Sequence, residues 1–339
     1  MKAVHLIKNG VSKEAFEIRD IAIPLPEDDE VIVKVDAFGL NYADVMARNG
    51  LYREAPALPS VLGYEVVGII HTVGTNISDD FIGKRVIAFT RFGGYAEYAK
   101  VNQLGFGLIG DMDTDVALCI ATQFVTAYYM STVITNFFPG NRVLVHAGAG
   151  GVGSALIQLL KAKGCIVYAT AGSERKLALM TKLGADHVIN YREKDYFEVI
   201  SKLLEGDRLD GTFNPIAGST FKKDYQLIGS GGRILLFGGS ERSGKKWGIL
   251  STLNFVRKMG AILPITMMMR SKSVIGVNML KIGDNKAEMI QYCMQEVIKL
   301  VESGHLKAEI GGVFKATEIT EAHDLLESRK STGKITVHW

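Results

Sequence analysis

Cysteine is scarce in this chain, and its few cysteines lie far apart. The 339 residues include three cysteines, Cys119, Cys165 and Cys293, none of which belongs to a Cys-x-x-Cys arrangement. A disulfide framework or a zinc site built from thiolates needs cysteines in closely spaced pairs. We therefore expect reduced thiols, as in a cytoplasmic protein.

Long apolar runs and a strong charge imbalance are absent as well. The N-terminal apolar run is too short for a signal peptide, because His5 and Lys8 interrupt it. The most apolar later stretch, 259–269, contains Pro264 and falls well short of a membrane-spanning helix. The net charge of +3 gives no strong signal for nucleic-acid binding. The sequence therefore predicts a protein without a transmembrane segment.

Two periodicities follow one another along the chain. In the first third, short apolar stretches such as 31–36 and 66–71 alternate with glycine-containing turns, which is typical of a β-barrel. From residue 142 onward, strands alternate with helical segments of roughly 10 to 15 residues. Such alternation predicts βαβ units and a doubly wound parallel sheet.

These patterns predict an α/β protein made of two domains. We place a barrel domain over 1–120 and a parallel-sheet domain over 121–262. Residues 263–339 are expected to return to the first domain and to form a pocket or dimer-interface segment.

A glycine-rich turn opens the second domain. Gly148, Gly150 and Gly153 form a G-x-G-x-x-G pattern between the strand at 142–146 and the helix at 154–163. The first glycine permits a tight turn, the second lets the backbone approach a pyrophosphate, and the third lets helix and strand pack closely. The helix N-terminus then attracts the phosphates. This context predicts a Rossmann dinucleotide-binding domain, with cofactor contacts at Gly150, Gly151, Val152 and Gly153.

The end of the next strand indicates which dinucleotide binds. Folds that prefer NAD place an Asp or Glu there to accept a hydrogen bond from the ribose 2′-hydroxyl. This strand ends instead in Ala171-Gly172-Ser173, and Lys176 follows shortly after. Small residues beside a hydroxyl and a cation suit a 2′-phosphate. The predicted cofactor is therefore NADPH, with Gly172, Ser173 and Lys176 at its 2′-phosphate.

The residues also resemble a known family over essentially the whole chain. The run 141–161 resembles the signature of zinc-free medium-chain dehydrogenases/reductases of the quinone oxidoreductase and zeta-crystallin branch, although Asn141-Arg142 stands where an acid is usual. The segment 227–280, rich in methionine and aromatic residues, is closer to the synaptic-vesicle membrane protein homologues of that branch. The resemblance implies a GroES-like β-barrel catalytic domain, a Rossmann nucleotide-binding domain and a homodimer.

The same resemblance implies further cofactor contacts. Segments that match those lying over and beneath the nicotinamide contain Asn41, Tyr42 and Asp44, and Thr126 and Tyr129, respectively. The remaining implied contacts are Tyr191 on the adenosine side, Phe237 and Gly238 beside the ring, and Arg329 near the C-terminus.

The chain lacks the metal ligands of zinc alcohol dehydrogenases. Those enzymes place a Cys and then a His on the catalytic zinc. The resemblance implies that Asn41 and Tyr64 take these two positions in this chain. Glu65 alone cannot form a tetrahedral site. The seven histidines are scattered and contain no i, i+4 pair. We therefore predict no metal site.

Without a metal, the easiest chemistry is reduction of an already activated acceptor. The candidate catalytic residues are Asn41, which would orient the ring or carbonyl, and Tyr52 and Tyr64, which would donate a proton or hydrogen bond to a developing enolate oxygen. Either tyrosine could instead be an aromatic wall. Residues 267–269, three consecutive methionines, line a lipophilic pocket or else pack in the core or a subunit interface.

The resulting functional hypothesis is zinc-independent, NADPH-dependent hydride transfer to a quinone or an α,β-unsaturated carbonyl. Three alternatives remain open at this stage. The chain could be an enoyl-thioester reductase, an NADPH-binding protein associated with a membrane or partner and with little catalytic activity, or, as zeta-crystallin relatives suggest, an RNA-binding protein.

Overall fold

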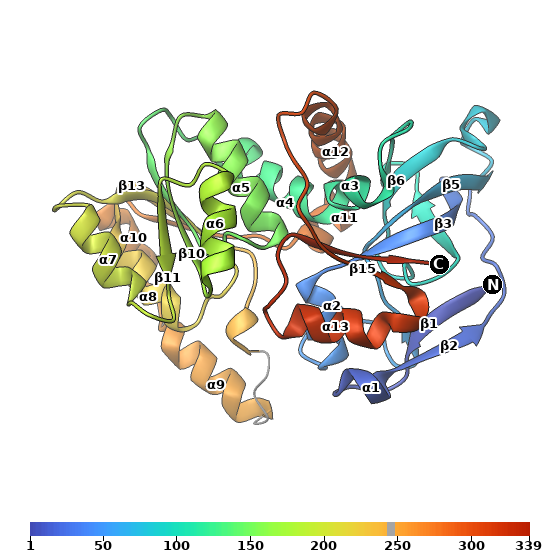
Figure 1. The fold of residues 1–339 in the computed structure, drawn as a ribbon, viewed down its shortest axis with the longest axis horizontal. Helices are drawn as coiled ribbons and strands as arrows, with labels where there is room; N and C mark the ends of the chain where they lie inside the picture. The colour runs from blue at the N-terminus through green and yellow to red at the C-terminus, as the bar shows by residue number, and fades with distance from the viewer. Residues whose placement is uncertain (243–247) are drawn as a thin grey trace. The chain divides into compact units, whose positions relative to one another are not determined.

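A computed structural model describes residues 1–242 and 248–339 (Figure 1). It divides into two compact units: unit 1 comprises Met1–Thr126 and Met279–Trp339, and unit 2 comprises Ala127–Asn278. Both boundaries lie later in the chain than 120 and 262, where the sequence patterns placed them. Residues 243–247, part of the longer 227–280 segment, lie outside the described residues.

Unit 1 contains a seven-stranded sheet in the order β15-β16-β3-β5-β6-β8, with β7 paired to β3. Its pairings are antiparallel except for β15 with β16, which is parallel. The strands are β3 (Glu30–Leu40), β5 (Glu65–Val73), β6 (Arg85–Phe89), β7 (Tyr98–Asn102), β8 (Phe106–Leu108), β15 (Ile310–Lys315) and β16 (Lys334–His338). The C-terminal strand β16 therefore lies beside β3, from the start of the chain.

A smaller sheet and several helices complete unit 1. The sheet has the order β2-β1-β4. Its strands are β1 (Lys2–Leu6), β2 (Phe16–Asp20) and β4 (Ser60–Val61), and the helices are α1 (Ser12–Ala15), α2 (Tyr42–Arg48), α3 (Thr114–Leu118), α11 (Met279–Asn285), α12 (Ala287–Glu302) and α13 (Ile319–Glu327). Apolar residues from β1, β3, β5 and β16 share one buried core.

Unit 2 is built around a six-stranded sheet in which every neighbouring pair is parallel. The strands are β9 (Arg142–Val145), β10 (Ile166–Ala171), β11 (His187–Asn190), β12 (Leu209–Asn214), β13 (Ile228–Leu236) and β14 (Ser273–Gly276). Their order, β11-β10-β9-β12-β13-β14, is that of dinucleotide-binding doubly wound folds. The predicted doubly wound parallel sheet is thus confirmed.

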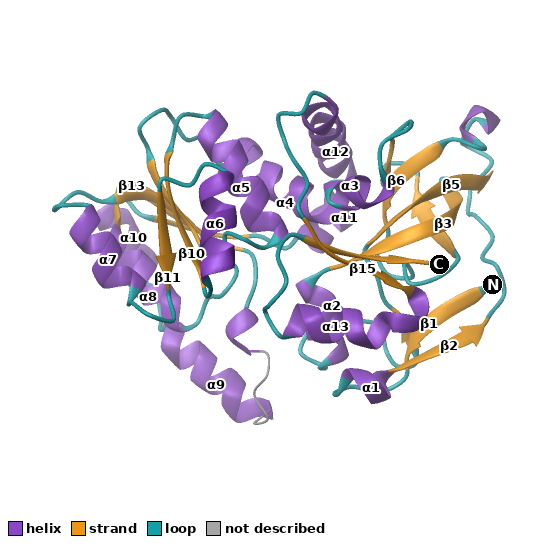
Figure 2. Cartoon of the chain, viewed as in Figure 1, coloured by secondary structure: helices purple, strands orange, loops and turns teal. Residues whose placement is uncertain are grey.

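Helices cover both faces of this sheet (Figure 2). They are α5 (Gly151–Ala162), α6 (Glu174–Lys182), α7 (Tyr196–Leu203), α8 (Ser219–Leu227), α9 (Gly248–Met259) and α10 (Pro264–Arg270). Since both faces are covered, the strands are almost continuously apolar, as in β9 and β10. The edge strand β14 follows α10 and pairs with β13, which explains why unit 2 extends past residue 262.

One helical run has the length and composition of a membrane span. Residues Thr114–Val133 form this run, and 72% of its apolar window is buried inside the structure. A core helix passes the same test, so the run is weak evidence for a membrane. Asp113 begins it as an N-cap, accepting hydrogen bonds from the Asp115 and Val116 amides. Two π-helical turns, Ile120–Phe124 and Tyr129–Val133, flank α4 (Val125–Tyr128).

Candidate functional site

The glycine turn between β9 and α5 is shaped by packing at two positions and left open at the third. A Cβ on Gly148 would lie 2.5 Å from Met180 Sδ, and a Cβ on Gly153 would lie 2.4 Å from the Ala147 carbonyl oxygen. A Cβ on Gly150 would meet only that carbonyl oxygen, at 3.3 Å, and the backbone there is extended. The fold therefore explains Gly148 and Gly153, whereas Gly150 suits the approach of a ligand.

The other cofactor residues predicted in unit 2 follow the ends of neighbouring parallel strands. Gly172 comes after β10, and Tyr191 comes after β11. Phe237 follows β13, where its amide donates to the Asn214 carbonyl at 3.3 Å. The carboxyl ends of parallel strands meet at one edge of a sheet, where such folds bind ligands. Unit 2 thus brings these residues to the same edge as the glycine turn.

Next to the end of β10 lies a cation, Arg192 from the segment after β11, that the sequence patterns did not select. A Cβ on Gly172 would lie 2.8 Å from Tyr191 Oη and 3.0 Å from Arg192 Nε, so this guanidinium stands directly beside the glycine. Among the described residues, the Arg192 guanidinium has no hydrogen-bond or ion-pair partner. The Ser173 side chain makes no capping bond to α6, although Ser173 is its N-cap residue. Glu174 accepts a hydrogen bond from the Asn190 amide at 3.4 Å.

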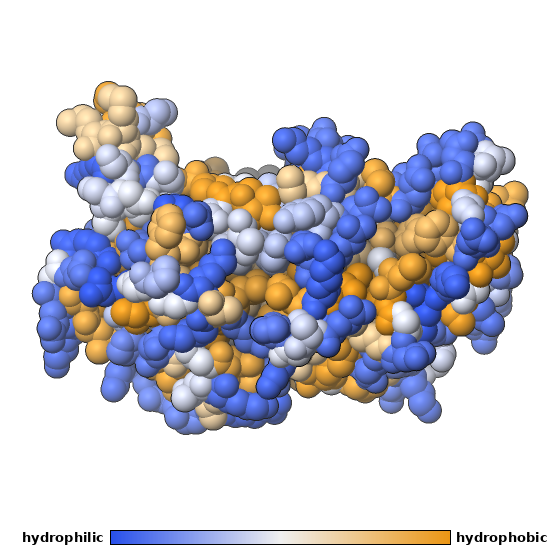
Figure 3. Space-filling view, turned by 90° about the horizontal axis from the view of Figure 1, so that it is seen from above, coloured by the Kyte–Doolittle hydropathy of each residue, from blue (hydrophilic) through white to orange (hydrophobic). Residues whose placement is uncertain are grey.

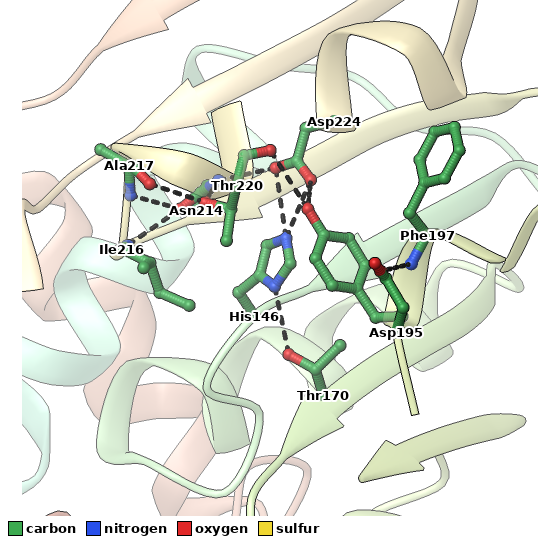
Figure 4. A network of polar contacts seen from close by, with 10 residues as sticks. His146, Thr170, Asp195, Phe197, Asn214, Ile216, Ala217, Thr220 and Asp224 are labelled. Atoms are coloured by element: carbon green, nitrogen blue, oxygen red, sulfur yellow. Dashed lines mark hydrogen bonds and ion pairs between the residues drawn. The ribbon is translucent and has the colours of Figure 1, made fainter. Parts of the chain in front are cut away.

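A buried polar network surrounds His146, the residue directly before the glycine turn (Figure 4). His146, directly after β9, places Nδ1 3.1 Å from Thr170 Oγ1 and Nε2 3.0 Å from Asp224 Oδ1. Asp224 also accepts a hydrogen bond from Asn214 Nδ2 at 2.6 Å, and Asn214 Oδ1 accepts from the backbone amide of Ala217 at 2.8 Å. The network therefore ties together the ends of β9, β10 and β12. Sequence reasoning treated His146 as one scattered histidine and missed it.

The predicted catalytic residues Asn41 and Tyr64 lie in unit 1 and are both buried. Asn41 is the N-cap of α2, and its backbone amide donates to Asp44 Oδ2 at 2.8 Å. Its side-chain amide donates to Glu65 Oε1 at 2.7 Å. Lys334 forms a fully buried ion pair with Glu65 and also donates to Asn41 Oδ1 at 3.3 Å. Sequence reasoning did not select Lys334.

Asp44, a predicted cofactor contact, is fully buried in unit 1. Burial raises the pKa of its carboxyl to about 7, against the hydrogen bond from the Asn41 amide, which lowers it. In this structure the Asp44 side chain stabilises the start of α2 by accepting this hydrogen bond. Its role toward a cofactor stays a prediction.

Tyr52 and Tyr64 form an aromatic pair with ring centroids 6.3 Å apart and an edge-to-face arrangement. Burial, followed by the charges of Glu54 and Asp44, raises the pKa of Tyr52 to about 12. Burial also raises the pKa of Tyr64, which is 4% exposed. The two hydroxyls influence each other's pKa, but no hydrogen bond of normal geometry joins them, and within residues 1–242 and 248–339 the Tyr64 hydroxyl has no hydrogen-bond partner. Both phenols therefore stay protonated at neutral pH.

The remaining predicted cofactor contacts lie in several different elements of the two units. Thr126 donates to the Thr122 carbonyl at the end of unit 1, and Tyr129 begins the second π-helical turn, in unit 2. Such turns are frequent at functional sites. Tyr42 begins α2, and Arg329 follows α13 with a left-handed backbone, φ 57°. A Cβ on Gly238 would lie 2.7 Å from the Pro215 carbonyl oxygen.

Comparison with known proteins identifies the class. An alcohol dehydrogenase GroES-like domain model matches residues 27–111, and a zinc-binding dehydrogenase model matches 151–302. Human quinone oxidoreductase is 32% identical over 339 residues, covering 99% of this chain and 97% of the relative. The human synaptic vesicle membrane protein VAT-1 homolog is 29% identical over 329 residues, covering 96% and 83%.

A solved structure agrees with these relatives. Escherichia coli quinone oxidoreductase complexed with NADPH superimposes with a TM-score of 0.88 at 26% identity, covering 100% of both chains. The chain belongs to the medium-chain dehydrogenase/reductase superfamily. More narrowly, it is an oxidoreductase that resembles quinone oxidoreductases, with the predicted GroES-like and Rossmann folds.

The zinc implied by one family model does not fit the residues of unit 1. Both Glu65 oxygens are engaged, Oε1 by Lys334 and Asn41 and Oε2 by the Thr122 amide at 2.8 Å. In the sequence resemblance, Asn41 and Tyr64 take the places of the Cys and His that bind zinc in zinc alcohol dehydrogenases. In residues 1–242 and 248–339, no group of three His, Cys, Asp or Glu side chains is arranged to hold a metal ion.

Proposed function

We propose that this protein catalyses zinc-independent, NADPH-dependent reduction of quinones or α,β-unsaturated carbonyl compounds. The observation that carries the proposal is the end of β10, where an unpaired Arg192 stands beside Gly172 and no acid occupies the strand tip. A guanidinium binds a 2′-phosphate with two hydrogen bonds, whereas an acid there would repel it. We further propose a cytoplasmic location, which suits the three free, buried cysteines.

NADPH, when bound, supplies a hydride to the electron-poor carbon of the acceptor. The glycine turn and the N-terminus of α5 would hold its pyrophosphate. As the acceptor gains negative charge on oxygen, the chain's own part is to donate a hydrogen bond there. Tyr64 fits this role, because its phenol is protonated and has no partner in the described structure. Tyr52 is the second candidate donor.

NADPH oxidation with a panel of quinones and enones tests the proposal. We expect turnover with at least one acceptor class and slower turnover with NADH. For Tyr64→Phe we expect a turnover number reduced roughly 10- to 1,000-fold on an enone, with NADPH affinity unchanged, because only the oxyanion loses a donor. Tight NADPH binding without turnover on any acceptor would contradict the proposal.

A second candidate function, an NADPH-binding protein associated with a partner or membrane, rests on the surface of α10. Ile265, Met268 and Met269 lie on one face of this helix and are 52%, 70% and 78% exposed. The sequence has no acidic residue between Glu241 and Asp284. Hydrophobic residues, orange in Figure 3, reach the surface in several places on the face that it shows. Met268 and Met269 therefore do not pack in the core, which was one reading of this segment.

We propose that a second copy of the chain covers this face. The edge strand β14 begins shortly after α10, and in the described structure only β13 pairs with it. An open strand edge beside exposed apolar side chains is a typical dimer surface. Light scattering should give a dimer for the natural protein and a monomer for Met268→Glu/Met269→Glu. A natural monomer that binds anionic vesicles would favour the membrane alternative instead.

A further inference from the structure

Glu65 and Lys334 form a fully buried ion pair in unit 1. Glu65 begins β5 and Lys334 begins β16, and both strands pair with β3. The pair crosses β3 at Gly39, where a Cβ would lie 2.3 Å from Lys334 Cε and 2.5 Å from Glu65 Oε1. Gly39 is therefore required so that the two charges can meet, next to the strand end that leads into Asn41.

The pair dictates how the Asn41 side chain is oriented. The carbonyl oxygen of this side chain faces the Lys334 ammonium at 3.3 Å, and its nitrogen faces Glu65 Oε1 at 2.7 Å. Turning the amide over would place its NH2 against the ammonium and its oxygen against the carboxylate, and both contacts would be repulsive. One N–H of Asn41 is left after the bond to Glu65.

A fully buried ion pair is not the most favourable way, in free energy, to hold two strands together. Removing two charges from water is costly, and apolar residues of similar size often serve stability equally well. The other contact of Glu65 runs from the Thr122 amide to Oε2, at 2.8 Å, in the π-helical turn that precedes Thr126. The ion pair thus organises two segments that carry predicted site residues.

We propose that Glu65 and Lys334 are positioning residues: their ion pair fixes the Asn41 amide so that its remaining N–H donates to the carbonyl oxygen of the acceptor. This inference rests on the proposed reduction of quinones or enones. Lys334 also neutralises Glu65, so the chain supplies its own cation beside the residues that replace zinc ligands. Neither charged group touches the acceptor.

A charge-neutral double variant separates positioning from stability. Lys334→Met alone leaves an uncompensated buried carboxylate and should lower the melting temperature strongly. Glu65→Gln/Lys334→Met removes both charges and leaves an acceptor for the Thr122 amide, so its melting temperature should return close to that of the natural protein. We expect its turnover number on an enone to stay reduced, roughly 10- to 100-fold, with NADPH affinity unchanged. The exposed pair Lys8–Glu14 supplies the matched control, Lys8→Met/Glu14→Gln, which should turn over normally.

Coupling to Asn41 completes the test. In an Asn41→Ala background the double variant should have no further effect on turnover, because the group being positioned is already gone. The side-chain amide resonances of Asn41, identified by their loss in Asn41→Ala, should shift in Glu65→Gln/Lys334→Met. A stable double variant with natural turnover would overturn the inference. If the natural protein reduces no acceptor, the proposed function fails, whereas unshifted Asn41 resonances would refute the positioning itself.

Discussion

At the scale of single residues, the clearest feature of unit 2 is a guanidinium, that of Arg192, for which the described residues offer no hydrogen-bond or ion-pair partner. By contrast, Lys161 and Lys223, which also lie at the surface of unit 2, form ion pairs. A guanidinium left unpaired beside Gly172 is available to a phosphate. Lys176, which the sequence favoured, lies in the first turn of α6.

The first prediction concerns cofactor choice. Arg192→Ala should raise the dissociation constant for NADPH at least tenfold, about 1.4 kcal/mol, because it removes a charge-assisted contact to the 2′-phosphate. The affinity for NADH, which lacks that phosphate, should barely change. Calorimetric titration with both cofactors measures this. Arg208→Ala is the control, because Arg208 directly precedes β12 and so lies at the amino ends of the parallel strands, away from the carboxyl ends where the cofactor residues are predicted.

Equal loss of NADPH and NADH affinity in Arg192→Ala would show that Arg192 supports the fold of the edge and does not select the cofactor. Lys176→Ala, tested in parallel, shows how much of the NADPH affinity each of the two cations contributes through the 2′-phosphate. If only Lys176→Ala changed the preference, the sequence-based choice would stand without Arg192.

The second prediction follows from the raised pKa of Asp44. The folded state holds the proton of this carboxyl up to about pH 7, whereas the unfolded chain releases it near the ordinary value of 3.8. The stabilisation is therefore complete below pH 3.8 and is lost as the pH rises through 7. Asp44→Asn cannot ionise and still accepts a hydrogen bond from the Asn41 amide.

Thermal unfolding between pH 5 and pH 8 checks this prediction. The melting temperature of Asp44→Asn relative to the natural protein should rise with pH over this range, by a few degrees in all. A difference that is constant with pH would mean that Asp44 ionises normally. Glu54→Gln, which removes another carboxylate of unit 1 that acts on Tyr52, should leave the pH dependence close to natural.

At the scale of secondary-structure elements, local patterns predicted what local geometry decides. The strand, glycine turn and helix at 142–163 depend on neighbouring residues, and the structure has them as β9 and α5. The ion pair of Glu65 with Lys334 joins opposite ends of the chain, so no spacing could reveal it. The sequence patterns ended the parallel-sheet domain at 262 because the short strand β14, which follows the methionine-rich α10, gives no distinct pattern of its own.

The third prediction separates the glycines of the turn by function. Gly153→Ala places a Cβ 2.4 Å from backbone, so it should lower the melting temperature markedly. Gly150→Ala meets only one atom, at 3.3 Å, and should fold with nearly natural stability. Its NADPH affinity should nevertheless fall at least tenfold, because the methyl group obstructs the pyrophosphate. Melting curves with and without NADPH compare the two variants, and unchanged NADPH stabilisation of Gly150→Ala would place the pyrophosphate elsewhere.

At the scale of the whole molecule, the cofactor residues predicted at the strand ends of the parallel sheet belong to unit 2, whereas the candidate catalytic residues Asn41, Tyr52 and Tyr64 belong to unit 1. The zinc-binding dehydrogenase model matches residues 151–302, which belong largely to unit 2, whereas the positions equivalent to zinc ligands lie in unit 1. A family match over the nucleotide-binding part therefore says little about metal in the catalytic part. What decides metal content is the set of side chains around Glu65.

The fourth prediction concerns that metal content. In place of soft or nitrogen ligands, this part of unit 1 offers an amide at Asn41, a phenol at Tyr64 and a carboxylate already neutralised by Lys334. A zinc ion would have to displace the ammonium and ionise a phenol whose pKa burial has raised, and both steps oppose binding. Elemental analysis of the purified protein should therefore find zinc well below one per chain, and EDTA should not reduce turnover. One zinc per chain, lost together with activity on chelation, would mean that metal binding rearranges the Glu65–Lys334 pair.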